Sequence, residues 1–247
     1  MMKSSTVIVV MPAYNAVKTL KETYAAIPKE CVDQIILVDD ASYDATFRQA
    51  QKLDLIAIRH LHNLGYGGNQ KTCYTEALRR GADIVIMLHP DGQYDPALIP
   101  RIVEPIAKGR ADVVLGSRMQ DKRAALAGRM PLYKFFANQF LTACENLVFR
   151  RRLSEYHSGY RAFSRTFLET VPFQRNSNDF VFDQEILAQA VAFGFRIAEI
   201  PIATRYFKEA SSISLMGSAR YGLKTLWLLV RFQCHRWHLV TGRLFVP

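Results

Sequence analysis

The sequence predicts an α/β fold in which a mostly parallel central sheet is flanked by helices. The first observation is that short apolar runs rich in β-branched residues alternate with segments of helical periodicity through the first half of the chain. The second is size, because 247 residues of which 49% are hydrophobic can bury a substantial core. The third is that no apolar run approaches the roughly 18 residues that span a bilayer. A globular fold with a covered parallel sheet follows from these three features.

The expected strands of the first half are apolar runs that stop where polar or turn-forming residues begin. They are Val7–Met11, Ile35–Asp39, Leu55–His60, Ile84–Leu88 and, as a shorter run, Val113–Gly116. Four segments between them repeat apolar residues at helical spacing, namely Val17–Ala26, Asp44–Leu53, Gly68–Arg80 and Pro96–Lys108. Pro96 suits a first helical turn, because the N–H that proline lacks would have no partner there.

The order of elements changes after Arg118. A basic loop over residues 120–129 leads to an amphipathic helix expected at Pro131–Phe149. The remaining expected elements are a helix at Asp183–Phe193, a strand at Arg196–Ile202 and a long helix at Ser218–Val240. No linker rich in Gly, Ser or Pro separates these parts. We therefore expect a single domain over residues 1–217, followed by an amphipathic basic helix within residues 218–247.

Composition limits the class of protein. Lys and Arg total 32 against 22 Asp and Glu, which gives a net charge of +10 and excludes a disordered acidic chain. The four cysteines are far apart and form no CxxC pair, so neither a zinc cluster nor a disulfide framework is indicated. A reducing cytoplasm is the expected compartment. The apolar run near the N-terminus lacks a small-residue cleavage site and is interpreted as a first strand, not a signal peptide.

Polar side chains follow three of the expected strands. Pro12 and Tyr14 follow the first, Asp39 and Asp40 end the second, and His-Pro-Asp-Gly-Gln at 89–93 follows the fourth. Ligands of open α/β sheets bind beyond the carboxyl ends of the strands, so these side chains are expected to share one site. Adjacent carboxylates can accept hydrogen bonds from a base and a ribose, and a later aspartate can hold a divalent cation against a diphosphate. This pattern indicates a nucleotide-sugar site, although the second segment alone would equally suit an Asx turn and a helix N-cap.

Six segments extend the pattern along the chain: VVMPAYN, ILVDDAS, NLGYGGNQKTCYTEAL, HPDGQYDP, LGSR and SGYRAFSR. In this order they resemble the family 2 glycosyltransferases with the GT-A fold, over roughly Val7–Ser212. The nearest resemblance is to soluble polyprenyl-phosphate sugar synthases of the dolichol-phosphate mannose synthase type. It implies a metal-dependent, inverting hexosyltransferase that moves a hexose-type sugar from a nucleoside-diphosphate sugar to an undecaprenyl or dolichyl phosphate. Residues from about 119 to 217 would then form the acceptor subregion of the catalytic domain.

The resemblance assigns a divalent cation, Mn²⁺ or Mg²⁺, to the loop after the fourth strand. The family reads Asp-x-Asp-x-Gln there, whereas this chain has His89, Asp91 and Gln93. Asp91 and Gln93 are carried over as metal ligands, and His89 stands in place of the first acidic residue. Neutral imidazole suits Mn²⁺ better than Mg²⁺. The alternative for His89 is a structural hydrogen bond at the end of the strand.

The same resemblance assigns the donor's nucleotide and phosphates. Pro12, Tyr14, Asp39 and Asp40 would contact the nucleotide, although Ala16 replaces an acidic residue that the synthases often carry, which leaves the base open.

Three further assignments concern phosphate. Gly68, with the glycines at 65 and 67, resembles a phosphate-cradling loop before a helix, and alone would signal only a turn. Arg118 and Arg205 match arginines that the family directs at the donor diphosphate, and the planar guanidinium suits such a partner. The alternative for Arg118 is a surface ion pair.

The acceptor side is carried over from the segment Ser158–Arg161, whose arginine in the family braces the acceptor region or reaches the lipid phosphate. Asp183 and Glu185 lie near the position of a general base in other inverting members. A hydroxyl acceptor requires such a base, but a phosphate acceptor is already ionised and can attack directly. Asp183 is therefore expected to serve acceptor-side architecture first and catalysis second. A soluble or glycan hydroxyl acceptor, with Asp183 as the base, remains the alternative.

Positive charge is concentrated at the C-terminal end. Residues 205–247 carry seven Lys or Arg and one acid, which is +6 of the total +10. Arg220, Lys224 and Arg231 fall on one helical face, which favours contact with an anionic membrane surface, while the alternative is a packing helix with a solvated edge. The charge also suits nucleic acid, but no nucleic-acid-binding motif is present, and no such partner is expected. The expected location is cytoplasmic, peripherally associated with the inner face of the membrane.

Overall fold

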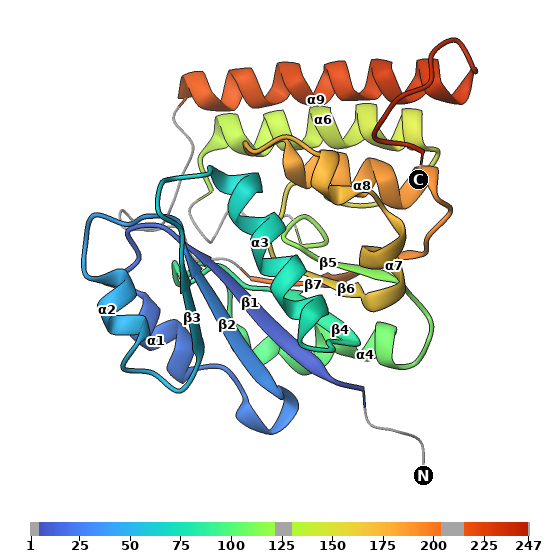
Figure 1. Ribbon diagram of the computed structural model, residues 1–247. Coiled ribbons are helices and arrows are strands. Elements are labelled where there is room, and N and C mark those ends of the chain that lie inside the picture. The colour runs from blue at the N-terminus through green and yellow to red at the C-terminus, as the bar shows by residue number, and fades with distance from the viewer. Residues whose placement is uncertain (1–4, 122–129, 204–214, 247) are drawn as a thin grey trace.

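The computed structural model describes residues 5–121, 130–203 and 215–246, which form a seven-stranded sheet with helices on both faces (Figure 1). The strands are β1 (Val7–Ala13), β2 (Gln34–Asp39), β3 (Ile56–Arg59), β4 (Ile84–Met87), β5 (Val113–Ser117), β6 (Arg161–Ser164) and β7 (Ile197–Pro201). They lie in the order β3-β2-β1-β4-β6-β5-β7. Six were expected from the sequence, with ends that differ by two residues at most. The predicted α/β fold class with a mostly parallel sheet is confirmed.

Strand β6 was not expected, and it is the antiparallel member of the sheet. It lies between β4 and β5, where Arg161 pairs with Met87 on one side and with Leu115 on the other. Its four residues begin with Arg and end with Ser, so they lack the continuous apolar run by which the other strands were recognised. The antiparallel direction brings the turn before β6 to the carboxyl ends of β4 and β5.

The helices largely follow the predicted segments, and α7 is an addition. They are α1 (Leu20–Ala25), α2 (Thr46–Ala50), α3 (Tyr66–Arg79), α4 (Ile99–Ala107), α6 (Leu132–Phe149), α7 (Arg165–Thr170), α8 (Phe182–Ala192) and α9 (Leu215–Arg236), with short 3₁₀ turns η1 (Lys29–Cys31), η2 (Pro96–Leu98) and η3 (Phe173–Arg175). The segment expected to start at Pro96 begins as η2, where the Asp95 side chain accepts a hydrogen bond from the backbone N–H of Ala97, and continues as α4. Helix α9 ends at Arg236, four residues before the expected Val240.

The core has two layers, one on each face of the sheet. Along β1 the side chains alternate, so that Ile8 and Val10 face one layer and Val9 and Met11 face the other. Helices α3, α7 and α8 cover the first face, and α1, α2 and α4 cover the second (Figure 1). Burial on both faces explains why the parallel strands appear in the sequence as continuous apolar runs.

Helices α6 and α9 lie side by side above α8 and run in the same direction (Figure 1). Phe149 of α6 meets Phe232 of α9 edge to face, with ring centroids 4.9 Å apart. Nearer the start of α9, Gly222 lies beside the side chain of Leu141 of α6. Helix α9 therefore packs on the body of the fold through one side. Among the described residues, no helix combines the length and the apolar character needed to cross a membrane.

Candidate active site

A cavity of about 510 Å³ opens at the carboxyl ends of β1, β4 and β5. One side is the segment after β1, which is tied to the segment after β4 because the Thr19 hydroxyl donates to the carbonyl of Pro90 at 2.6 Å. The opposite side is formed by α6 and α9. Residues discussed below that line it are Tyr14, Tyr66, His89, Asp91, Gln93, Arg118, Lys134, His157, Asp183, Ser218 and Tyr221. The structure thus brings together most of the predicted site residues that it describes.

His89 is held at the base of this cavity with both ring nitrogens buried and without a hydrogen-bond partner among the described residues. The Tyr66 ring stacks on the imidazole, with centroids 5.5 Å apart and an interplanar angle of 6°. A Cβ atom at Gly159 would lie 2.8 Å from Cε1 of His89, so only glycine leaves room for the ring. The structural hydrogen bond considered as the alternative for His89 is absent from the described part of the chain. An imidazole with two unpartnered nitrogens is suited to a ligand.

Asp91 and Gln93 line the cavity beside His89. The Asp91 carboxylate accepts a hydrogen bond from the Gln93 backbone N–H at 3.0 Å, and burial raises the pKa of this carboxyl. A buried carboxylate that pays a desolvation cost gains from a nearby cation. The described residues contain no group of three His, Cys, Asp or Glu that could hold a metal. One imidazole, one carboxylate and one amide are side chains that can serve as ligands to a divalent cation, and a bound diphosphate would have to supply the remaining ligands.

Asp39 and Asp40, predicted nucleotide contacts, differ in their surroundings. Asp39 is fully buried, with Oδ2 at 3.3 Å from Nε of Arg59, while Oδ1 has no partner among the described residues. Asp40 accepts hydrogen bonds from His60 Nδ1 at 2.7 Å and from the backbone N–H of Leu64 at 2.8 Å, so it holds the loop before α3. Of the two, Asp39 keeps an oxygen without a partner among the described residues, but that oxygen is buried, and neither aspartate lines the cavity.

The turn after β2 shows only part of the Asx turn and helix N-cap that were the alternative to nucleotide binding for this segment. The backbone N–H of Ser42 donates to Oδ2 of Asp39 at 3.3 Å, as in an Asx-type turn. However, the N-cap residue of α2 is Ala45, and the Asp44 carboxylate accepts a hydrogen bond from the backbone N–H of Thr46 at 2.9 Å, so the helix start is held by Asp44 and not by the segment at 39–42. Pro12 is buried within β1, whereas Tyr14 is 48% exposed at the rim of the cavity.

The glycines before and within α3 have a packing role. Gly65 has φ +85°, and a Cβ there would lie 2.6 Å from the carbonyl oxygen of Asn178. The N–H of Gly67 donates to the same carbonyl at 2.8 Å. A Cβ at Gly68 would lie 2.8 Å from Cβ of Leu64, and Gly68 does not line the cavity. Gly65 and Gly67 therefore allow close backbone packing against the segment before α8, and Gly68 allows a close turn beside Leu64. The phosphate-cradling role of Gly68 stays a prediction.

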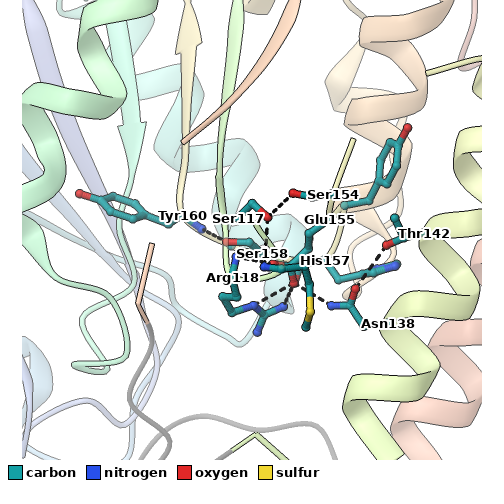
Figure 2. A network of polar contacts seen from close by, with 12 residues as sticks. Ser117, Arg118, Asn138, Thr142, Ser154, Glu155, His157, Ser158 and Tyr160 are labelled. Carbon is teal, nitrogen blue, oxygen red and sulfur yellow. Dashed lines mark hydrogen bonds and ion pairs between the residues drawn. The ribbon is translucent and has the colours of Figure 1, made fainter. Parts of the chain in front are cut away.

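Arg118 forms a buried ion pair, as Figure 2 shows. Its guanidinium pairs with Glu155, and its Nε donates at 2.8 Å, while Asn138 Nδ2 donates to the same carboxylate at 2.7 Å. Burial alone would raise the pKa of Glu155, but the Arg118 guanidinium holds this pKa below its usual value. The alternative of an ion pair is thus correct, but the pair is buried and not on the surface. The Arg118 guanidinium that lines the cavity is therefore already paired with the Glu155 carboxylate.

The carboxylate of Asp183 is also engaged by the protein. It accepts hydrogen bonds from Tyr66 Oη at 2.8 Å and from Gln70 Nε2 at 3.0 Å, and Nη1 of Arg161 lies 3.6 Å away. Arg161 is fully buried, and its guanidinium donates to the carbonyls of Ser158 and Asp183. Arg161 therefore braces the turn before β6 and the start of α8. Both oxygens of the Asp183 carboxylate are thus engaged by side chains of the protein.

Lys134, His157 and Tyr221 line the cavity but were not selected from the sequence. His157 Nδ1 lies 2.8 Å from Tyr221 Oη, and its Nε2 lies 3.1 Å from Oε2 of the fully buried Glu145. These residues come from α6, α9 and the turn before β6, so only the tertiary fold brings them together. The helical repeat of Tyr133, Ala137 and Leu141 on the cavity side of α6 was the one sequence signal for this wall. Arg205, predicted to contact the diphosphate, lies outside the described residues.

An open α/β sheet in this strand order, with a cavity at its strand ends, is the arrangement expected for the GT-A fold of glycosyltransferases. Residues 8–171 match glycosyl transferase family 2, and the chain belongs to this family. A UDP-N-acetylglucosamine–dolichyl-phosphate N-acetylglucosaminyltransferase of Methanococcus voltae is 30% identical, over 83% of this chain and 88% of its own length. An undecaprenyl-phosphate mannosyltransferase of Micrococcus luteus is 26% identical, over 90% of this chain and 96% of its own length.

Solved structures show the same fold. Glucosyl-3-phosphoglycerate synthase from Mycobacterium tuberculosis, in complex with Mn²⁺, uridine diphosphate and phosphoglyceric acid, superposes with a TM-score of 0.71. It is 18% identical, and the match covers 93% of this chain and 79% of that one. The predicted family and GT-A fold are thereby confirmed.

Proposed function

We propose that this glycosyltransferase moves a hexose-type sugar from a nucleoside-diphosphate sugar to a polyprenyl phosphate at a membrane surface, with inversion. The observation that carries the proposal is the division of the cavity into two chemically different sides. The side at the strand ends holds Asp91 and the unpartnered His89, while the side at α6 and α9 holds cations and apolar groups. Relatives of similar length that act on dolichyl phosphate and undecaprenyl phosphate support the acceptor class.

The strand-end side suits the donor. Oδ1 of Asp39 is a buried acceptor that can receive a hydrogen bond from the base or the ribose, and the exposed ring of Tyr14 offers a stacking surface at the rim. Asp91, His89 and Gln93 would hold Mn²⁺ or Mg²⁺ against the diphosphate. When bound, such a cation supplies charge neutralisation for the leaving group. The Mn²⁺ and Mg²⁺ complexes of structurally similar synthases support this assignment.

The acceptor's phosphate oxygen would attack the anomeric carbon while the bond from that carbon to the diphosphate breaks and the nucleoside diphosphate leaves. No proton has to be removed from an ionised phosphate. This agrees with an Asp183 carboxylate whose oxygens are occupied by Tyr66 and Gln70. A hydroxyl acceptor would need Asp183 to give up these bonds, which makes it the second candidate.

The outer sides of α6 and α9 support presentation of the acceptor by a membrane. Exposed apolar residues recur at helical spacing on one side of each helix: Leu132, Phe136, Phe140 and Leu147 on α6, and Met216, Leu223, Trp227 and Val230 on α9. Arg220 and Arg231 fall on the same side of α9. Lys224, the third basic residue expected to meet lipid, instead pairs with Asp179. Two apolar stripes bordered by arginine suit the surface of an anionic bilayer, at the cytoplasmic face.

A donor and acceptor screen tests the proposal. Purified protein would be incubated with UDP-, GDP- and dTDP-sugars and Mn²⁺ or Mg²⁺, with and without undecaprenyl phosphate in anionic vesicles. The proposal expects release of the nucleoside diphosphate that depends on the lipid phosphate, with one base strongly preferred. Equal turnover with a soluble hydroxyl acceptor and none with the lipid would favour the second candidate.

A further inference from the structure

The cations on the α6 and α9 side of the cavity are not equivalent. The charge of Arg118 is matched by Glu155, which is fully buried behind it. Lys134 lines the same side, and among residues 5–121, 130–203 and 215–246 it has no hydrogen bond and no ion pair with an acidic side chain. The ammonium of Lys134 is therefore the unmatched positive charge of this wall.

Lys134 is also held where its charge is costly. Burial, reinforced by the like charge of Arg118, lowers the pKa of the Lys134 ammonium. Both effects disfavour the charged form of Lys134, and an anion placed beside the ammonium would offset both. A partly buried lysine with no acidic partner, facing a cavity, is more readily explained by a ligand than by the fold.

Hydroxyl donors are present in the same wall. Tyr221 and Ser218 of α9 line the cavity together with Lys134 of α6. The phenol of Tyr221 is kept in place by His157, which lies 2.8 Å from it and is itself backed by the buried Glu145 at 3.1 Å. Gln184 Nε2 adds a further contact to the same hydroxyl. One cation and two hydroxyls that line one cavity are donors suited to a phosphate monoester.

We propose that Lys134 determines acceptor specificity by binding the phosphate of the acceptor, with Tyr221 and Ser218 as accompanying donors. This inference rests on the proposed function and names the group that recognises its acceptor. Lys134 lies on the α6 and α9 side of the cavity, whereas Asp91 follows β4, so its effect is expected on the acceptor and not on the nucleotide. The apolar stripe of Tyr133, Ala137 and Leu141 beside it continues the wall for the first carbons of the lipid.

The test separates acceptor binding from donor binding. Lys134→Met, Lys134→Arg and the control Lys52→Met, at an exposed lysine outside the cavity, would be compared with the unmodified protein. Farnesyl phosphate serves as a short acceptor and farnesol as its phosphate-free counterpart. Calorimetry measures the binding of farnesyl phosphate and of UDP with Mn²⁺, and initial rates give the KM for each substrate.

Loss of one charge-assisted contact to phosphate is expected to weaken farnesyl phosphate binding by about 10- to 100-fold in Lys134→Met. Lys134→Arg should recover most of that loss, and UDP affinity should be unchanged in all variants. The inference is overturned if Lys134→Met binds farnesyl phosphate as tightly as the unmodified protein, or if it loses UDP affinity instead. If farnesyl phosphate binding depends on Lys134 but the unmodified protein transfers no sugar to a polyprenyl phosphate, only the proposed function is refuted.

Discussion

Replacing Glu155 by Gln removes the charge that matches Arg118 while keeping the shape of the side chain. The Glu155 carboxylate accepts hydrogen bonds from the backbone N–H of Arg118 at 2.7 Å, from its guanidinium, and from Asn138 at 2.7 Å. The side chain of Glu155 is 0% exposed and that of Arg118 is 11% exposed. An amide cannot accept at both ends, so at least one buried donor loses its partner and the guanidinium charge is left unmatched.

Breaking a buried pair of this kind costs about 3–5 kcal/mol of the free energy of unfolding. For a chain of this size the thermal midpoint should fall by roughly 10 °C. The matched control is Glu169→Gln, which removes the exposed ion pair with Arg165 and should cost about 0–1 kcal/mol. Urea unfolding followed by circular dichroism measures both variants at pH 7.

The pH dependence gives a second check. The pKa of Glu155 is lowered in the folded protein, so its stabilising contribution is complete above the pKa of an unfolded glutamate, about 4.3. It is lost as the pH falls through the lower folded-state pKa. The difference between unmodified protein and Glu155→Gln should be constant from pH 8 to about pH 5 and shrink below about pH 4. Equal stability of the two proteins at pH 7, or a difference that does not shrink in acid, would refute the role given to this pair.

Three further predictions concern ligands. Asp91→Ala should abolish transfer and weaken Mn²⁺ binding in the presence of UDP, measured by electron paramagnetic resonance; near-normal activity in excess chelator would contradict a metal-dependent mechanism. Asp39→Asn should raise the donor KM about tenfold with a smaller effect on kcat, because its buried Oδ1 acts on the bound donor before and during reaction, and unchanged donor affinity by calorimetry would rule this out. Cosedimentation with anionic vesicles should fall with salt and in the double variant Arg220→Gln, Arg231→Gln, at about 1 kcal/mol per residue, whereas equal binding to neutral vesicles would exclude the electrostatic contact.

Features encoded locally could be predicted from the sequence. Apolar runs with turn-forming ends located six of the seven strands, and the polar residues after them predicted the site at the strand ends. Strand β6 escaped because its burial comes from its neighbours β4 and β5 and not from its own composition. The packing role of Gly65 and Gly67 was missed for a related reason, since the segment at 177–178 that they meet is distant in the sequence.

The α6 and α9 side of the cavity depended on tertiary contacts more than the side at the strand ends did. The matching of Arg118 by Glu155 joins residues 37 positions apart, and the contact between His157 and Tyr221 joins residues 64 apart. No spacing rule relates such residues before the chain folds. The family resemblance indicated Arg118 as a phosphate ligand, whereas the structure shows that Glu155 already pairs with Arg118 and that Lys134 has no acidic partner among the described residues.

Transfer of sugar to the phosphate of a polyprenyl phosphate is tested most directly by ³¹P nuclear magnetic resonance of the acceptor during turnover. Undecaprenyl phosphate would be incubated with the protein, Mn²⁺ and the donor sugar nucleotide selected in the screen. The account predicts that the phosphomonoester signal of the lipid is replaced by a phosphodiester signal, in step with release of the nucleoside diphosphate. Release of the nucleoside diphosphate with the phosphomonoester signal unchanged, and with the sugar recovered on a hydroxyl group, would contradict it.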